Sequence, residues 1–493
     1  MERKLSDQEI NRRNKLNALQ TNNQDPFIIT KVARTHNSQT FMQKFDQYSK
    51  EELHDLELTE VVLAGRLMNV RRTFGIVADF DGKFQIYVNK KQVSAEVFAL
   101  FNDLDNGDFI EVHGTPMKTN TQELTLNVTN IILISKCLNV LPEKYHGLVD
   151  EEIKARHRYL DLIMNDNSKQ TFILRSKIIR AIRNFLDQDN YFEVETPVLN
   201  DILGGAAAKP FVTFHNTLAK NYYLRIATEI ALKKCIIGGF EKVYEIGRIF
   251  RNEGMDSTHN PEFTSLELYA AYEDLNYIMD LTENLFKHLV QVLKIKNITF
   301  RGFDIDLNQP FAKKHMVDLI NEHVGVNFYD IETDEQALAL ADKYEVKYEK
   351  HQQTYGHIVN LFFEKFVEEK LIQPTFVYGH PLDVSPLTKK NKNDPRFTER
   401  FELFIGQKEF ANAYAELNDP LDQRSRFMKQ IAEKDLGNDE ANELDEEFLY
   451  ALEYGMPPTG GLGIGIDRLV MLLTSNDTIR NVLLFPHMKD KAN

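Results

Sequence analysis

Residues 247–269, together with the strand that leads into them, most constrain what this chain can fold into. Segments 244–251 and 263–269 alternate apolar and polar residues, the period of a half-buried strand. The segment between them, 254–261, is rich in Gly, Asp, Ser, Asn and Pro, which favour turns. We therefore predict an antiparallel hairpin with a long tip.

This hairpin carries side chains that suit an anionic ligand with an aromatic ring. Arg251 offers a planar fork for a carboxylate or phosphate, and Phe263 offers a stacking face. The same residues would also fit an exposed hairpin, because surface hairpins commonly carry charge. The rest of the sequence is needed to choose between the two interpretations.

Length and composition limit the class of protein. A chain of 493 residues predicts two or three domains. It has no apolar run near the roughly 18 residues of a membrane span, and its first ten residues are polar and charged. Cys137 and Cys235 are too few for a disulfide framework or a zinc site. We therefore expect a cytoplasmic protein that does not span a membrane.

The formal net charge of −15 argues against a protein that coats nucleic acid without specificity, since such binding needs a basic surface. It leaves specific binding through a local patch open. It also suits a pocket that holds a cation.

The periodic segments predict the domain order. Residues 1–55 resemble a helical arm, whose basic residues suit a solvated helix as well as a contact to nucleic acid. Residues 56–136 contain five strand-like segments, with a short helix between the third and fourth, the pattern of an OB-fold barrel. Residues 137–170 would link this barrel to a catalytic domain at 171–493. A helical insertion is expected at about 310–375, where the sequence indicates no site.

A second hairpin is predicted at residues 401–416, with its turn at Gly406 and Gln407. By the two-residue period of a strand, Asn412 and Tyr414 share one face, and Glu409 faces the other way unless a bulge intervenes.

The segment 459–473 predicts a glycine-rich strand followed directly by an apolar helix. Its glycines would let a ligand lie against bare backbone. The spacing does not fit the dinucleotide fingerprint, and the chain has no Gly-Lys-Ser/Thr, which excludes a P-loop.

Three separated segments resemble the signature motifs of class II aminoacyl-tRNA synthetases. Residues 192–197, after a long helix, resemble the first motif; residues 250–263 resemble the second and residues 461–468 the third. The OB-like segment narrows the resemblance to the lysine, aspartate and asparagine branch. The strings at 204–211 and 412–419 are similar to its lysine-specific members.

The resemblance implies an α+β protein: an N-terminal OB-fold β-barrel that binds the anticodon, then a class II catalytic domain. That domain would have a mixed, mainly antiparallel sheet of six or seven strands flanked by helices. The resemblance also implies a homodimer that uses ATP, L-lysine, tRNA(Lys) and Mg²⁺. Lysine and ATP would give lysyl-adenylate and pyrophosphate, and the lysyl group would then pass to the terminal adenosine of the tRNA.

The family's residue roles transfer to matching positions of this chain. Arg251 and Arg468 would be catalytic, and Glu402 and Glu409 would bind magnesium. By resemblance, the ATP site comprises Arg251, Glu253, His259, Phe263 and Arg468. The lysine site comprises Gly205, Glu229, Glu267, Tyr269, Asn412, Tyr414, Glu416 and Gly461. Phe74 and Gln85 would contact the anticodon, although the loop at 71–75 is shorter than in many relatives.

Three alternatives stay open. An aspartate or asparagine enzyme of the same branch is one, but an aspartate enzyme would need cations where this chain offers Glu267 and Glu416. A transferase that attaches lysine to a protein is the second, although such relatives usually lack the OB-like domain. The third is an inactive paralogue that binds tRNA, which the intact motif arginines and acids oppose.

Overall fold

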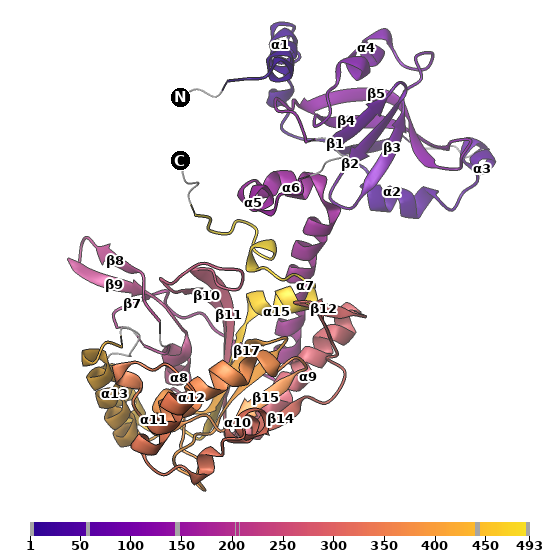
Figure 1. Cartoon of the computed structure of the whole chain (residues 1–493). Helices are drawn as coiled ribbons and strands as arrows, with labels where there is room; N and C mark the ends of the chain where they lie inside the picture. The colour runs from indigo at the N-terminus through magenta and orange to yellow at the C-terminus, as the bar shows by residue number, and fades with distance from the viewer. Residues whose placement is uncertain are drawn as a thin grey trace. The chain divides into compact units, whose positions relative to one another are not determined.

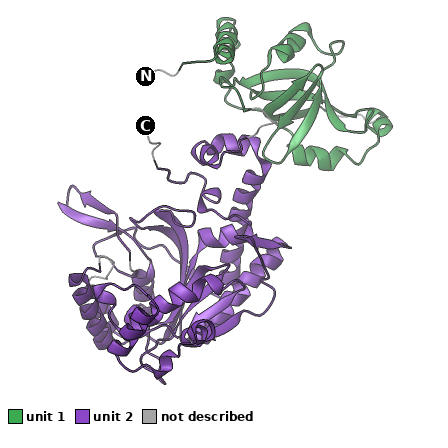
Figure 2. Cartoon of the chain, in the orientation of Figure 1, with its two compact units in different colours: residues 1–147 green, residues 148–493 purple. Residues whose placement is uncertain are grey.

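The computed structural model describes residues 4–55, 60–142, 148–202, 204–206, 208–438 and 444–489. The chain divides into two compact units, residues 1–147 and 148–493 (Figure 2). Each unit is described by itself below. Within the described residues, no helix is long and apolar enough to cross a membrane.

The first unit is a closed five-stranded barrel with strand order β1-β2-β3-β5-β4 (Figure 1). Its apolar residues alternate along each strand and meet inside the barrel, as in β2, where Gly75 and Val77 are buried. The strands are β1 (Val61–Arg71), β2 (Phe74–Ala78), β3 (Lys83–Tyr87), β4 (Phe109–Lys118) and β5 (Leu124–Ser135). Helix α4 (Ala95–Asp103) lies between β3 and β4 in the chain, as the OB-fold pattern predicted.

The N-terminal residues fold into helices of the same unit: α1 (Asp7–Thr21), α2 (Ser38–Phe45) and α3 (Lys50–Asp55). Ser6 and Glu9 form the capping box that starts α1. Arg12 of α1 donates hydrogen bonds to the carbonyls of Cys137 (3.1 Å) and Asn139 (2.5 Å). Lys15 pairs with Asp105 at 3.2 Å. These cations of the arm therefore hold α1 to its own unit.

The second unit is built on an eight-stranded sheet, ordered β14-β15-β16-β17-β18-β11-β10-β6. The sheet is mixed and mainly antiparallel, because the edge pairs β14–β15 and β6–β10 are parallel. It has more strands than the six or seven that the resemblance implied. Its strands are β6 (Phe192–Glu193), β10 (Lys242–Phe250), β11 (Glu262–Ala271), β14 (Ala312–His315), β15 (Thr375–Tyr378), β16 (Arg400–Ile405), β17 (Lys408–Ala415) and β18 (Thr459–Gly465).

One face of this sheet packs against helices and forms the main core. Leu266, Leu268 and Ala270 of β11 lie in a cluster with residues of β16, β17 and β18. Helices α7 (Asp166–Gln188), α9 (Leu275–Leu293) and α15 (Ile466–Leu473) contribute the opposing apolar residues. By the two-residue period, Glu267 and Tyr269 point to the other face of the sheet. The helices of the main core do not cover that face, so it is available for a site.

The remaining elements surround that second face or extend the unit. Helices α10 (Met316–Val324), α11 (Asp334–Lys343) and α12 (Tyr355–Phe366) have a core of their own. The other helices are α5 (Glu151–Arg156), α6 (Arg158–Met164), α8 (Glu229–Ile237), α13 (Pro420–Asp435) and α14 (Glu446–Glu453). Two small sheets contain β7 (Leu199–Asn200), β8 (Val212–His215) and β9 (Lys220–Leu224), and β12 (Ile298–Phe300) and β13 (Phe303–Ile305).

Candidate active site

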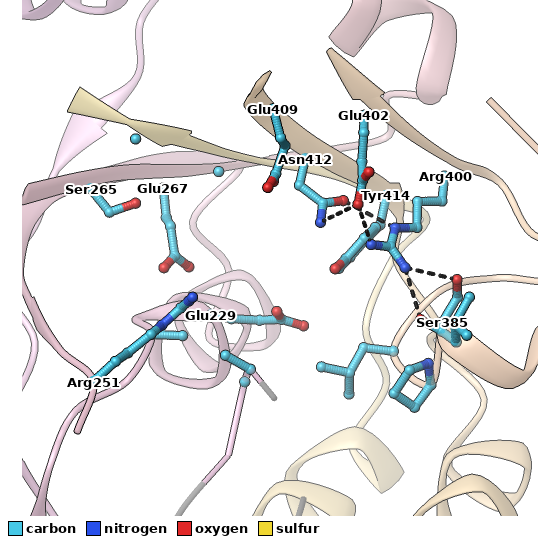
Figure 3. Close-up of a pocket in the computed structure, with 18 of the residues that line it drawn as sticks. Glu229, Arg251, Ser265, Glu267, Ser385, Arg400, Glu402, Glu409, Asn412 and Tyr414 are labelled. Carbon is cyan, nitrogen blue, oxygen red and sulfur yellow. Dashed lines mark hydrogen bonds and ion pairs between the residues drawn. The ribbon is translucent and has the colours of Figure 1, made fainter. Parts of the chain in front are cut away.

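The second face of the large sheet forms the floor of a cavity of about 700 Å³. Figure 3 shows acidic, basic and amide side chains that point into it from several elements. The structure brings together every residue predicted for the ATP, lysine and magnesium sites. These are Gly205, Glu229, Arg251, Glu253, His259, Phe263, Glu267, Tyr269, Glu402, Glu409, Asn412, Tyr414, Glu416, Gly461 and Arg468.

Strand register explains how the centre of this floor is formed. Glu267 of β11 pairs with Gly463 of β18, and Gly463 pairs on its other side with Asn412 of β17. Gly461 lies in the same way between Tyr269 and Tyr414. Glycine on the central strand therefore leaves open space between the polar side chains of its two neighbours.

A bulge brings Glu409 into the cavity. Between β16 and β17 the register shifts, so that Leu403 pairs with Ala411 but Phe404 pairs with Glu409. The extra residue, Phe410, is 2% exposed and belongs to the core. Glu409 and Asn412 consequently point to the same side of the sheet (Figure 3). The two-residue period alone would have placed Glu409 on the opposite side.

One end of the cavity is acidic and almost closed to solvent. Glu267 is 9% exposed and Glu416 is 1% exposed. The Thr228 backbone N–H donates to Glu267 Oε1 at 3.0 Å, and Tyr269 Oη donates to Glu267 Oε2 at 3.4 Å. Burial raises the pKa of Glu267 to about 7 and the pKa of Glu416 to about 8. This end is therefore built to receive positive charge.

Lys233, which the sequence analysis missed, lies behind this acidic end. Its Nζ is 2.5 Å from Glu229 Oε1 and 2.5 Å from Glu416 Oε2. The side chain is fully buried, and the two carboxylates hold the pKa of the Lys233 ammonium above its ordinary value in spite of burial. The four-residue spacing of Glu229 and Lys233 on a predicted helix was a signal that could have found the first of these pairs.

Arg400 is the second residue that the sequence analysis missed. Its guanidinium donates to Glu402 Oε1 at 2.6 Å, to Asn412 Oδ1 at 3.1 Å and to the Val384 carbonyl at 2.8 Å. Arg400 lies two residues before Glu402 on one strand, so the two-residue period could have placed both on one face. It links the acidic pair of the cavity to a predicted lysine-binding residue.

The two arginines predicted for phosphate binding, Arg251 after β10 and Arg468 in α15, both line the cavity. The Arg251 guanidinium is 5.2 Å from the centre of the Phe263 ring. Arg468 donates to the Glu409 carbonyl at 2.8 Å and lies 3.1 Å from His259 Nε2. His259 is in turn 2.8 Å from Asp256. Cations and an aromatic face thus line the part of the cavity that the hairpin tip forms.

Glu402 and Glu409 form a carboxylate pair on the wall that β16 and β17 provide. Burial favours the neutral form of Glu402, but Arg400 and His380 lower its pKa to about 2. Burial, followed by the charge of Glu402, raises the pKa of Glu409. Within the described ranges, no three His, Cys, Asp or Glu residues are grouped to hold a metal. The pair fits a hard cation that takes its other ligands from water and phosphate.

The cavity also extends to residues that the sequence analysis assigned to no site. They come from the helical insertion and from α13, and they include His351, His357, Asn360, Glu364, Gln430 and Glu433.

Comparison with known proteins agrees with this geometry. Residues 150–489 match the family of tRNA synthetases class II (D, K and N). This chain belongs to that family. Residues 61–134 match the OB-fold nucleic acid binding domain.

Curated members of the family are similar over the whole chain. The lysine–tRNA ligase of Ureaplasma urealyticum serovar 10 is 70% identical over 492 residues, which cover 100% of both chains. The lysine–tRNA ligase of Malacoplasma penetrans is 58% identical, and that of Mycoplasmoides gallisepticum is 52% identical, each with 100% of both chains covered.

Of the two residues predicted to contact the anticodon, Phe74 lines a groove of the OB-fold unit and Gln85 does not. Phe74 stacks near Tyr87, with ring centres 4.9 Å apart, and both line a groove of this unit. Gln85 does not line that groove; it accepts a hydrogen bond from Thr125 and donates one to Glu123.

The short loop at 71–75 is a tight turn. Strands β1 and β2 pair as far as Arg71 and Phe74, and Arg72 has a φ of 53°. This turn places Phe74 at the start of β2.

Proposed function

We propose that this chain is a lysine–tRNA ligase. It activates L-lysine with ATP to form lysyl-adenylate and pyrophosphate, and then transfers the lysyl group to the 3′-terminal adenosine of tRNA(Lys). The observation that carries the choice of lysine is the buried acidic end of the cavity. Glu229, Glu267 and Glu416 line it, and Lys233 pairs with Glu229 and Glu416. The full-length relatives, each a lysine–tRNA ligase, support the same choice.

The acidic end favours lysine over the other substrates of this branch. Burying a charge without a partner is costly, so the carboxylates of this end would reject the anionic side chain of aspartate. The neutral side chain of asparagine would bring no cation to these carboxylates. Lysine supplies one ammonium for Glu267, Tyr269 and Glu416, and a second for Glu229 and the carbonyl of Gly205.

The activation step requires positioning and charge neutralisation more than a protein nucleophile. The lysine carboxylate attacks the α-phosphate, and negative charge develops on the phosphate oxygens. Arg251 holds the carboxylate and the α-phosphate together, since its planar fork can bind both groups. Phe263 stacks on the adenine, Glu253 contacts its edge, and Arg468 and His259 lie on the phosphate side.

Glu402 and Glu409 would hold Mg²⁺, on which lysine–tRNA ligases as a class depend. The ion would neutralise the phosphates of ATP when it is bound. Arg400 keeps Glu402 ionised and in place, because it donates to Glu402 and is itself anchored by the Val384 carbonyl. The bulge at Phe410 keeps Glu409 on the same wall.

The enzyme would act in the cytoplasm as a homodimer. Exposed apolar side chains on and near the first-motif segment support a dimer, since such patches commonly mark interfaces. Phe192 is 62% exposed and its ring centre is 5.8 Å from that of Phe240, which is 44% exposed.

The test is the formation of lysyl-tRNA by the purified chain. With ATP, magnesium, radiolabelled lysine and tRNA(Lys), we expect acid-precipitable label that depends on all four components. Charging of tRNA with aspartate or asparagine, and not with lysine, would overturn the proposal. A chain that binds tRNA without charging it would instead be a binding module.

A further inference from the structure

We propose that Lys233 is a fixed counter-ion that positions Glu229 and Glu416 for the two ammonium groups of the substrate and so sets the charge of the lysine subsite. This inference rests on the proposed function, because it takes lysine as the substrate. It makes Lys233 a positioning residue: Glu229 and Glu416 line the cavity, whereas Lys233 lies behind them.

The surroundings of Lys233 hold its ammonium in one place. The side chain is fully buried on α8, one turn after Glu229. Its Nζ lies 6.0 Å from the centre of the Phe448 ring of α14, and Leu232 and Phe448 belong to the apolar cluster on that side. The strongly polar groups that meet Nζ are the carboxylates of Glu229 and Glu416, each at 2.5 Å.

Lys233 engages one oxygen of each carboxylate. It contacts Oε1 of Glu229 and Oε2 of Glu416. Among the described residues, Glu416 Oε1 is buried and has no hydrogen-bond partner. This oxygen lies against the backbone of Gly461, where a Cβ would come within 2.0 Å of it. A buried acceptor without a partner at the floor of a cavity is placed to receive a donor from the substrate.

The charges of this end balance when lysine is bound. Glu229 and Lys233 come from α8, Glu267 and Tyr269 from β11, and Glu416 follows β17. Three carboxylates against the Lys233 ammonium leave two negative charges, which equal the two ammonium groups of lysine. Arg251, whose charge also acts on Glu267, is matched by the carboxylate of the substrate. Without Lys233, one buried carboxylate would have no cation, and it would take up a proton or move.

The consequence for pH can be derived from the groups that face Glu416. Besides Lys233, these are the carboxylates of Glu229 and Glu267 and the hydroxyls of Tyr269 and Tyr414. Lys233 is the cation among them, so its removal makes ionisation of Glu416 harder. Lysine binding would then require a higher pH.

The experiment is lysine-dependent ATP–pyrophosphate exchange by full-length Lys233→Met, with Lys234→Met as the matched control. Lys234 is the next residue of the same helix, but it is 30% exposed and pairs with Glu447, away from the acidic end. We expect the KM for lysine to rise at least about 30-fold at neutral pH in Lys233→Met, because breaking a buried pair leaves a buried charge. The KM for ATP should stay within about threefold, since the ATP residues are untouched.

The pH profile separates positioning of charge from a merely structural role. In Lys233→Met, loss of the counter-ion should raise the pKa of Glu416. The pH at which kcat/KM for lysine rises should therefore increase by about one unit or more. Lys234→Met should keep the profile of the unsubstituted enzyme. An unchanged profile, an unchanged KM for lysine, or equal losses for lysine and ATP would each overturn the inference.

A second comparison covers the case in which Lys233→Met does not fold. The double variant Lys233→Met/Glu416→Gln removes both charges of one pair and is compared with Glu416→Gln alone. Because Lys233 acts through its carboxylates, adding Lys233→Met should raise the KM for lysine by less than about tenfold in this background. A larger increase would overturn the inference. Failure of the unsubstituted enzyme to exchange with lysine would instead count against the proposed function.

Discussion

Arg400 Nη2 lies 2.6 Å from Glu402 Oε1, and both side chains rise from the cavity face of β16. The same guanidinium donates to Asn412 of the neighbouring strand. A group proposed for magnesium binding and a group proposed for lysine binding therefore share one arginine.

Replacing that arginine tests the proposed metal pair. In Arg400→Gln, Glu402 loses the cation that keeps it ionised and in place. We expect the apparent magnesium affinity or the exchange rate to fall about 10- to 100-fold, the usual cost of removing a group that orients a metal ligand. The measurement is ATP–pyrophosphate exchange over a range of magnesium concentrations. A variant with the same magnesium dependence and the same rate would contradict this role.

Lysine binding should strengthen as pH rises from about 6 to about 8. Burial raises the pKa of Glu267 to about 7 and that of Glu416 to about 8, and a neutral carboxyl cannot pair with an ammonium. We expect kcat/KM for lysine to rise about tenfold or more over this range, while KM for ATP changes little. Glu267→Gln should weaken lysine far more than ATP; equal losses would refute its assignment.

Glu267 and Glu416 make the stability of the empty enzyme fall as pH rises, whereas they make lysine binding stronger. The folded-state pKa values of Glu267 and Glu416 are raised above the ordinary 4.5, so their neutral forms suit the empty site. That contribution to stability is fully present below about pH 4.5 and is lost as pH rises through 7 and 8. Bound lysine offsets the loss. The increase in Tm that lysine produces should therefore be larger at pH 8 than at pH 6, by thermal denaturation.

Gly461→Ala should damage the lysine subsite. A Cβ at this position would lie 2.0 Å from Glu416 Oε1 and 2.6 Å from Tyr269 Cε1, so both side chains would have to move. We expect a loss of about 1–3 kcal/mol in stability, typical of overpacking. The KM for lysine should rise as well.

Gly463→Ala is the matched control on the same strand for stability. A Cβ there would meet its nearest atoms at 3.8 and 3.9 Å, which is ordinary contact. Its Tm should stay close to that of the unsubstituted enzyme. Equal losses of stability in the two variants would contradict the steric argument.

Phe74→Ala should weaken tRNA charging and leave tRNA-independent exchange unchanged. Phe74 lines a groove of the OB-fold unit, and loss of one stacking aromatic typically costs about 1–3 kcal/mol. Phe80→Ala is the control, because Phe80 is 68% exposed in the same unit and does not line that groove. If both variants charged tRNA as well as the unsubstituted enzyme, Phe74 would have no role in anticodon binding.

Local sequence patterns were sufficient for the parts of the fold that depend on neighbouring residues. The period of two predicted the strands that carry Glu267, Tyr269, Asn412 and Tyr414, and the glycine-rich segment predicted the strand between them. The sequence analysis predicted that Glu409 could face the site only if a bulge intervened, and the structure has one at Phe410. Its occurrence depends on the pairing with β16, which a single strand's sequence does not specify.

Contacts between distant residues were harder to predict. Lys233 of α8, which packs on β10 and β11, meets Glu416, although 183 residues separate the two in sequence. Arg400 depends in the same way on the Val384 carbonyl. The expected number of strands came from the family resemblance and was too small. The edge strand β14 has four residues, which are too few to show a period of their own.

The most direct measurement is ATP–pyrophosphate exchange without tRNA, run in parallel with lysine, ornithine, aspartate and asparagine in the presence of magnesium. The charge balance at Glu229, Glu267, Glu416 and Lys233 predicts exchange with lysine and none with aspartate or asparagine. Exchange with aspartate or asparagine would contradict the account of the acidic end, and no exchange with any of the four would contradict the proposed activity.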